Sequence, residues 1–248
     1  MATLVVNREI KSSGEPSISL NARAIYILLL CAIATLAVLS TIAKVVMLAF
    51  PAEQYGAVNE LCKRFYLDFE NNVPAWFSTI GLFVAAMLLG VIAYCHRQGN
   101  KRGYWHWLGM SLIFFCLAID EATYFHEILI DSLRDKLHLH GILYFGWVIP
   151  GFVFVAMVGG AYLPWVWRLP AKVRNGLILA GVFYVGGALG MELIGGMLAE
   201  SQGFDAPSYI LAMTVEETLE MIGIATLIYT LLRYIGTLYP QSLRISIR

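Results

Sequence analysis

Charged residues are scarce in this chain. Aspartate, glutamate, lysine and arginine together make up 14% of its 248 residues, whereas 59% are hydrophobic. A soluble globular domain is usually about a quarter charged, so the composition excludes an ordinary soluble enzyme or binding module. Nothing indicates nucleic acid as a partner, because no basic run is interleaved with aromatic residues in a soluble segment.

Cysteine is also rare and carries no motif. The four cysteines stand singly, without C-x-x-C spacing, so neither a disulfide framework nor a thiolate metal site is indicated. Other signatures are missing too: a G-x-S-x-G elbow, an H-E-x-x-H motif, a phosphate-binding Walker loop and a dinucleotide fingerprint. The five histidines are too few for the histidine-rich boxes of membrane hydroxylases and desaturases.

Long apolar stretches dominate what is present. A helix needs about 20 apolar residues to cross the hydrocarbon core of a bilayer. Six stretches are long enough, namely 24–50, 74–95, 104–130, 141–167, 173–199 and 208–235. They predict an all-α fold, a polytopic six-helix transmembrane bundle, as a single domain over 23–236. We expect a disordered polar tail over 1–22 and a short cytoplasmic tail over 237–248.

Two shorter features lie between the first and second predicted spans. Apolar residues recur at helical spacing within 51–73, with charged residues between them, which predicts a short amphipathic helix on the membrane interface. The Asn71–Pro74 sequence, NNVP, then predicts a helix cap followed by a proline in the first turn.

Lysine and arginine predict the orientation of the bundle. Basic residues gather in the short loops on the cytoplasmic side of a membrane. Here they precede the first span, join the second to the third and the fourth to the fifth, and follow the sixth. Both termini are therefore predicted to be cytoplasmic. The acid-rich connections would face the extracytoplasmic side of the plasma (inner) membrane.

The fifth predicted span, 173–199, is unusually rich in glycine and alanine. Gly186 and Gly190 have the small-xxx-small spacing that lets another helix approach closely. We expect this span to be central in the bundle. The same face is also a surface through which copies of the chain could form a helix–helix oligomer.

Carboxylates recur in three of the predicted spans at one depth. A helix rises about 1.5 Å per residue, which places the acids of spans 104–130, 173–199 and 208–235 in the extracytoplasmic half of the membrane. At about 100° per residue, Asp120, Tyr124 and Glu127 share a polar stripe, with His126 at its margin. The candidate metal ligands are Asp120, Glu121, His126, Glu127, Glu192, Glu216, Glu217 and Glu220.

This excess of buried acid requires compensation. One charged residue at the centre of a membrane costs at least about 2.5–3.5 kcal/mol. Lys44 and Tyr124 are predicted to support the acids through charge and hydrogen bonding. Carboxylates from several helices together with an imidazole are typical of dinuclear iron or manganese sites. The leading hypothesis is an iron or manganese oxidoreductase acting on a lipid-phase substrate such as an acyl chain, an isoprenoid or a quinol.

Two observations keep other hypotheses open. The E-x-x-H spacing of soluble dinuclear sites is absent from the acid cluster, and Asp120 and His126, six residues apart, are not expected on one helical face. The same acids would suit a proton- or cation-coupled transporter or channel. A non-catalytic subunit of a membrane complex is the third hypothesis, motivated by the small-residue face of 173–199.

Overall fold

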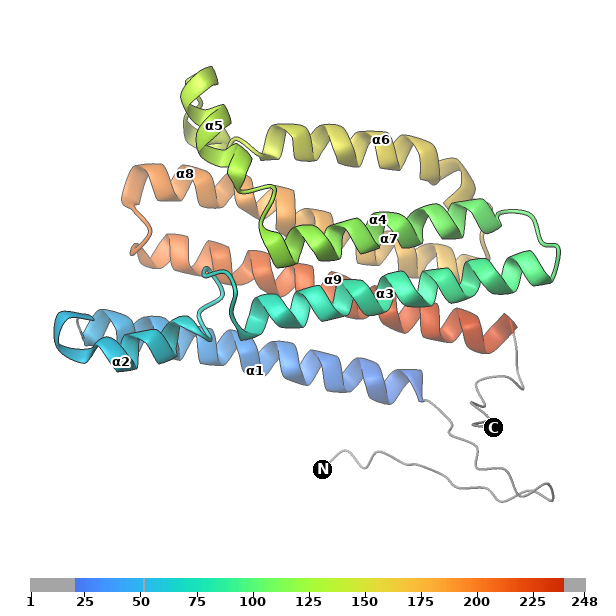
Figure 1. Ribbon diagram of the computed structural model, residues 1–248, viewed down its shortest axis with the longest axis horizontal. Helices are drawn as coiled ribbons and strands as arrows, with labels where there is room; N and C mark the ends of the chain where they lie inside the picture. Colours follow the sequence, from blue (N-terminus) through green and yellow to red (C-terminus); the bar gives the residue numbers. More distant parts are fainter. Residues whose placement is uncertain (1–20, 51, 239–248) are drawn as a thin grey trace, which may run out of the picture.

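In the computed structural model, which describes residues 21–50 and 52–238, the chain folds into a bundle of long helices lying side by side (Figure 1). The elements are α1 (Ala22–Ala49), α2 (Ala52–Lys63), α3 (Val73–Gln98), α4 (Tyr104–Thr123), α5 (Ile128–Leu137), the 3₁₀ turn η1 (Gly141–Leu143), α6 (Val148–Val166), α7 (Ala171–Val185), the π-helical segment η2 (Gly186–Met191), α8 (Glu192–Gln202) and α9 (Pro207–Leu238). The described residues contain no strand, so the predicted all-α fold is confirmed. The predicted tails lie mostly in 1–20 and 239–248, outside the described residues.

Length and composition make this a multi-pass membrane protein. Among the described residues, five helical runs are long and apolar enough to cross a bilayer: α1, α3, α6, the run Ala171–Gln202 and α9. A sixth span results if α4 and α5 are counted together, although the two helices meet at an angle of 84°. The described chain therefore has five or six spans where the sequence predicts six.

Helix α9 forms the centre of the bundle. In its 18-residue apolar stretch 67% of the residues are buried, against 6% in that of α6. Helices α1, α3, α7 and α8 all pack against α9, while α6 lies along the edge of the bundle (Figure 1). The last predicted span is thus enclosed by protein, and α6 is left with most of its surface facing outward.

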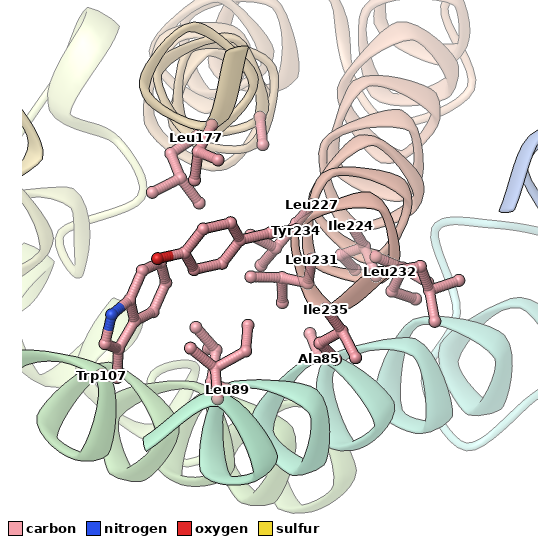
Figure 2. Packing of buried hydrophobic residues seen from close by; sticks show 14 of the residues in the cluster. Ala85, Leu89, Trp107, Leu177, Ile224, Leu227, Leu231, Leu232, Tyr234 and Ile235 are labelled. Atoms are coloured by element: carbon pink, nitrogen blue, oxygen red, sulfur yellow. The ribbon is translucent and has the colours of Figure 1, made fainter. Parts of the chain in front are cut away.

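The largest hydrophobic cluster occupies the end of the bundle away from the acids. Figure 2 shows Leu231 and Tyr234 of α9 surrounded by Leu89 of α3, Trp107 of α4 and Leu177 of α7. Leu89, Trp107 and Leu231 have no exposed surface. Because lipid is as apolar as these side chains, their packing stabilises the bundle through close van der Waals contact between helices.

Asparagine caps begin two of the spans. The Asn21 side chain accepts hydrogen bonds from the backbone N–H groups of Arg23 and Ala24, at 3.0 and 3.2 Å. Asn72 accepts one from the backbone N–H of Ala75 at 2.9 Å, with Pro74 in the first turn of α3. Such caps satisfy N–H groups that have no partner within the helix. The prediction made from NNVP is confirmed.

Two predicted spans differ in detail from the structure. The span expected over 141–167 begins with the short turn η1, and α6 starts only at Val148. The span expected over 173–199 is continuous but contains η2, whose π-helical hydrogen bonding was not anticipated. Single π-turns of this kind are common at functional sites, and η2 lies directly before Glu192.

Candidate functional site

The predicted third span breaks where its acids begin. Helix α4 ends at Thr123, and Tyr124 adopts a left-handed conformation with φ of 57°. The chain then turns by 84° into α5. The prediction of one continuous helix over 104–130 is therefore wrong, and the stripe drawn through Asp120, Tyr124 and Glu127 does not extend past Thr123.

Asp120 holds this break together. Its carboxylate accepts hydrogen bonds from the backbone N–H of His126, at 3.1 Å, and from Nδ1 of the His126 ring, at 2.7 Å. An aspartate that bonds to a nearby backbone N–H offers the chain an alternative to helical hydrogen bonding. The expectation that Asp120 and His126 stay apart is consequently wrong, because it assumed an unbroken helix.

A cavity of about 550 Å³ lies between the helices at this level. Its lining includes all eight candidate ligands predicted from the sequence, Asp120, Glu121, His126, Glu127, Glu192, Glu216, Glu217 and Glu220. They come from α4, the loop that follows it, α8 and α9. The convergence predicted from helix depth is therefore present. The volume is within the range of about 300–1,000 Å³ common for ligand sites.

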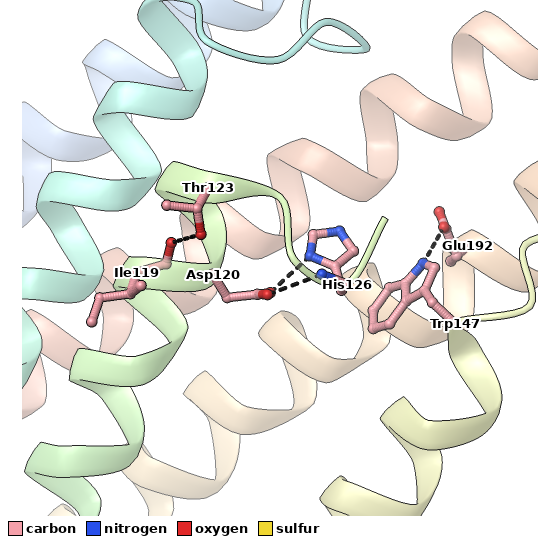
Figure 3. A network of polar contacts seen from close by, with 6 residues as sticks. All are labelled: Ile119, Asp120, Thr123, His126, Trp147 and Glu192. Atoms are coloured by element: carbon pink, nitrogen blue, oxygen red, sulfur yellow. Dashed lines mark hydrogen bonds and ion pairs between the residues drawn. The ribbon is translucent and has the colours of Figure 1, made fainter. Parts of the chain in front are cut away.

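One side of the cavity carries a chain of contacts that links three helices. Figure 3 shows the His126 ring between Asp120 and Trp147, with ring centroids of His126 and Trp147 4.7 Å apart. The Trp147 indole N–H donates to the Glu192 carboxylate at 2.6 Å. Glu192 in turn lies within hydrogen-bonding reach of Glu216. Two carboxyl groups can form a hydrogen bond with each other only when one of them carries a proton. Alternatively, a cation bound between them can hold them together.

Glycine brings η2 and α8 close enough to α9 for this contact. A Cβ atom at Gly187 would lie 2.7 Å from the backbone oxygen of Glu216 and 2.8 Å from Cγ of Glu220. A Cβ atom at Gly195 would lie 3.7 Å from the Glu216 carboxylate. The small residues predicted to allow close approach thus do so within the chain. Gly186 and Gly190 have no atom this close, and the oligomer stays a prediction.

Three further acids face the cavity without a partner of their own. Glu121, Glu217 and Glu220 form no hydrogen bond or ion pair among the described residues. Glu217 and Glu220 lie on the same inward side of α9, three residues apart. No lysine or arginine of the described chain lines this cavity. Among the described residues, His126 is the one basic side chain on its wall, and Lys44 acts from outside the wall on Asp68.

The two predicted supporting residues lie beside the cavity rather than on its wall. Lys44 is buried and pairs with the Asp205 carboxylate at 2.8 Å, and its ammonium lies 4.8 Å from the centre of the Tyr66 ring. The Tyr124 hydroxyl accepts a hydrogen bond from the backbone N–H of Asn71. Both therefore bond to residues outside the predicted cluster.

Sequence reasoning missed two acids of the site. Asp68 and Glu70 belong to the segment between α2 and α3, yet both line the cavity. The hydroxyl of Tyr209 on α9 donates to Asp68 at 2.7 Å and so fixes this segment over the cavity. No periodic pattern marks a loop that folds over a site. The one signal was the acidic character of the sequence Leu67–Glu70, LDFE.

The environment of Asp68 raises its pKa from 3.8 to about 6. Burial is the main cause, and the nearby charge of Glu192 adds to it, while Tyr209, Lys44 and Tyr66 oppose the increase. A carboxyl group whose pKa is higher in the folded than in the unfolded protein binds its proton more tightly when folded. The stability from this proton is present below about pH 4 and is lost as the pH rises through 6.

Asp68→Asn is expected to remove that dependence on pH in the metal-free protein. Wild type and variant should melt at similar temperatures near pH 4, and the variant should be more stable by roughly 5 °C at pH 7. Thermal unfolding in detergent over this range, with the exposed Asp131→Asn as control, measures the difference. Parallel curves for wild type and Asp68→Asn would contradict the assignment.

The side chains of the cavity are not arranged as a ready-made metal site. Among the described residues, no three histidine, cysteine, aspartate or glutamate side chains are grouped closely enough to hold one metal ion. Glutamate side chains that line an open space can turn about three bonds, so the residues that face the cavity supply more oxygen donors than the present rotamers bring together.

Comparison with known proteins adds a family but no activity. No curated protein and no solved structure matches the chain. One family model, described as a domain of unknown function (DUF8692), matches residues 24–234, a range that covers α1, the acid-lined cavity and nearly all of α9. The chain therefore belongs to the DUF8692 family of domains of unknown function.

Proposed function

We propose that this protein is an intramembrane metal-dependent oxidoreductase that acts on a lipid-phase substrate. One observation carries the proposal: the acid-rich wall and an apolar wall belong to the same cavity. The apolar wall is formed by α4, α6 and α7, with Met110, Ile113, Phe114, Leu117, Phe154, Val155, Val158 and Leu177. A site of this kind can hold a hydrocarbon group against a cluster of carboxylates.

Bound cations would offset the excess of acid. Isolated carboxylates in a membrane interior are costly unless they are paired, hydrated, protonated or bound to ions. Donor sets with many carboxylate oxygens and one imidazole suit iron or manganese, and two such ions are shared by carboxylates in helical bundles. Glu121, Glu217 and Glu220 would hold the ions together with Glu192 and Glu216. Asp120 would orient the His126 ring through its hydrogen bond.

The metals would supply the redox chemistry. The protein would position their ligands and limit the access of water to the cavity. Trp147 fixes the Glu192 carboxylate through its indole N–H. The apolar residues of α4 and α7 would limit the access of water to that side of the cavity. An acyl chain, an isoprenoid or a quinol is the substrate class that fits such a wall.

The proposal also includes an orientation. The start of α1 packs near the end of α9, and the basic connections α3–α4 and α6–α7 lie at that same end of the bundle (Figure 1). By the positive-inside rule this end is cytoplasmic. The acid-lined cavity then opens toward the extracytoplasmic side of the plasma (inner) membrane.

Elemental analysis of protein purified in mild detergent without chelators tests the metal proposal. We expect about two iron or manganese ions per wild-type chain, by analogy with dinuclear carboxylate bundles. The double variant Glu192→Gln, Glu217→Gln should lose them, because amides are weaker ligands for these ions than carboxylates. Glu60→Gln is the matched control, since Glu60 pairs with Lys63 on the surface and lies outside the cavity. Folded wild-type protein without metal would contradict the proposal.

Proton- or cation-coupled transport is the second candidate. The contact between Glu192 and Glu216 favours it, because a carboxyl pair that shares a proton can take up and release that proton. Flux into liposomes that Glu217→Gln abolishes, with no metal retained by the wild type, would support transport over catalysis.

A further inference from the structure

We propose that the hydrocarbon chain of an amphiphile without negative charge enters the cavity sideways from the membrane, between α4 and α6. This inference rests on the lipid-phase substrate of the proposed function and adds the route of entry and the charge of the ligand.

The first observation is the position of α6. Residues of α4 and of α6 line the cavity together, but the backbones of the two helices barely approach each other. Their ring contacts lie at the end away from the acids, where the Trp165 ring of α6 is 5.0 Å from His106 and 4.8 Å from Trp107. Figure 1 shows α6 on the outer edge of the bundle, beyond α4 and α7. Phe154 of α6 lines the cavity and is still 40% exposed. The wall between cavity and lipid is therefore incomplete at this helix.

The second observation is open space at two glycines that line the cavity. Gly159 on α6 and Gly181 on α7 have no atom within 4 Å of the place where a Cβ atom would stand. Glycine in the interior of a helix is less favourable than alanine. The absence of side chains at both positions leaves a passage next to the apolar wall.

The third observation concerns the head of the ligand. The described part of the cavity lining has nine carboxyl side chains, the His126 imidazole, and no lysine or arginine. In the metal-free protein a phosphate or carboxylate head would lie among these carboxyl groups with no lysine or arginine on the described wall to balance its charge. Within residues 21–50 and 52–238, no side chain or backbone group forms a hydrogen bond or ion pair with the Glu217 or Glu220 carboxylate. A hydroxyl or ammonium head can donate hydrogen bonds to them.

Aromatic side chains strengthen this preference. Trp147, Tyr184 and Tyr209 line the cavity together with the acids. Aromatic faces attract ammonium groups, and the Tyr184 hydroxyl has no hydrogen-bond partner among the described residues. The ligand class is thus an alkyl or isoprenoid chain that ends in a neutral or cationic polar group.

Three photoreactive probes test this proposal. They carry the same alkyl chain with a diazirine and end in an alcohol, an amine or a carboxylate. In wild-type protein stripped of metal with a chelator, we expect the alcohol and the amine to label α4 and α6 at least about tenfold more than the carboxylate, because only the carboxylate places a negative charge beside acids that have no cation. Equal labelling by the carboxylate probe would overturn the charge preference.

A matched pair of variants tests the route. Gly159→Phe places an aromatic ring in the passage, whereas Gly160→Phe adds the same ring at the neighbouring open position, which does not line the cavity. Gly159→Phe should reduce labelling by the alcohol and amine probes at least about fivefold through steric exclusion, and Gly160→Phe should leave it unchanged. Gly181→Phe repeats the test from α7. Labelling unchanged in both Gly159→Phe and Gly181→Phe would overturn the route.

The outcome can be separated from that of the proposed function. Probe labelling does not require metal, and the Gly159→Phe variant retains every acid of the cavity. Metal-free protein that still shows the labelling pattern would contradict the metalloenzyme and support the lipid site. If the purified protein contains metal and the labelling pattern is absent after chelation, the lipid site alone is contradicted.

Discussion

Gly223→Ala is expected to destabilise the protein by about 2–3 kcal/mol, with a fall in melting temperature of roughly 4–12 °C. At Gly223 the central helix α9 touches the backbone of α7. An added Cβ atom would lie 2.7 Å from the Tyr184 nitrogen and 2.9 Å from the Ala180 oxygen. Backbone atoms cannot turn aside as a flexible side chain can, so the two helices must separate.

Gly181→Ala on α7 is the matched control for this prediction. The same substitution there meets no atom within 4 Å and should be neutral or stabilising by roughly 0.5–1 kcal/mol, because alanine is the better helix former. Thermal unfolding of both variants in the same detergent measures the contrast. Equal melting temperatures for the two variants would show that α7 and α9 are not in backbone contact at Gly223.

Asp120→Ala is expected to make the segment between α4 and α5 less ordered and to lower the free energy of unfolding by about 2 kcal/mol. The carboxylate accepts two hydrogen bonds from His126, and bonds to charged groups contribute about 1.5–3 kcal/mol each when shielded from water. The side chain is 33% exposed, which reduces that sum. Without Asp120 the backbone N–H of His126 and its ring lose their common acceptor, and the segment that carries Glu127 should become mobile.

The comparison for this second prediction is Asp131→Ala. Asp131 pairs with Arg134 on the surface of α5, with 78% of its side chain exposed, and such pairs contribute only about 0–1 kcal/mol. Hydrogen exchange of residues 121–127 should increase in Asp120→Ala and stay unchanged in Asp131→Ala. A double variant with His126→Ala should lose little more than Asp120→Ala alone. Additive losses would mean that the two side chains do not act through each other.

Much of the fold could be predicted from local sequence. The cap at Asn72 and the proline after it define the start of α3 in the way that NNVP indicates. The long apolar runs correspond to α1, α3, α6, the run Ala171–Gln202 and α9, because a bilayer admits only backbone that satisfies its own hydrogen bonds. The predicted start of the fourth span at 141 was too early, since apolar composition alone does not distinguish η1 from a helix.

The sequence predicted which residues line the candidate site better than it predicted how they are arranged. Depth along each helix brought the acids of α4, α8 and α9 to one level, and all eight predicted ligands line one cavity. Helical periodicity failed at Tyr124, where the chain leaves the helix. Asp68 escaped prediction because its place over the cavity depends on a hydrogen bond from Tyr209, 141 residues away.

The sequence by itself determined that this chain is a membrane-spanning helical protein with acids at one depth. The length of an apolar segment and the charges within it are properties of contiguous residues. They decide for each helix separately whether it can cross the bilayer. The tertiary structure alone decided that Asp120 meets His126, that Lys44 pairs with Asp205, and that α6 lies at the edge of the bundle. Those outcomes depend on a broken helix and on contacts between residues far apart in the sequence. Such contacts result from the summed energies of many neighbouring groups, so a local sequence pattern does not predict them.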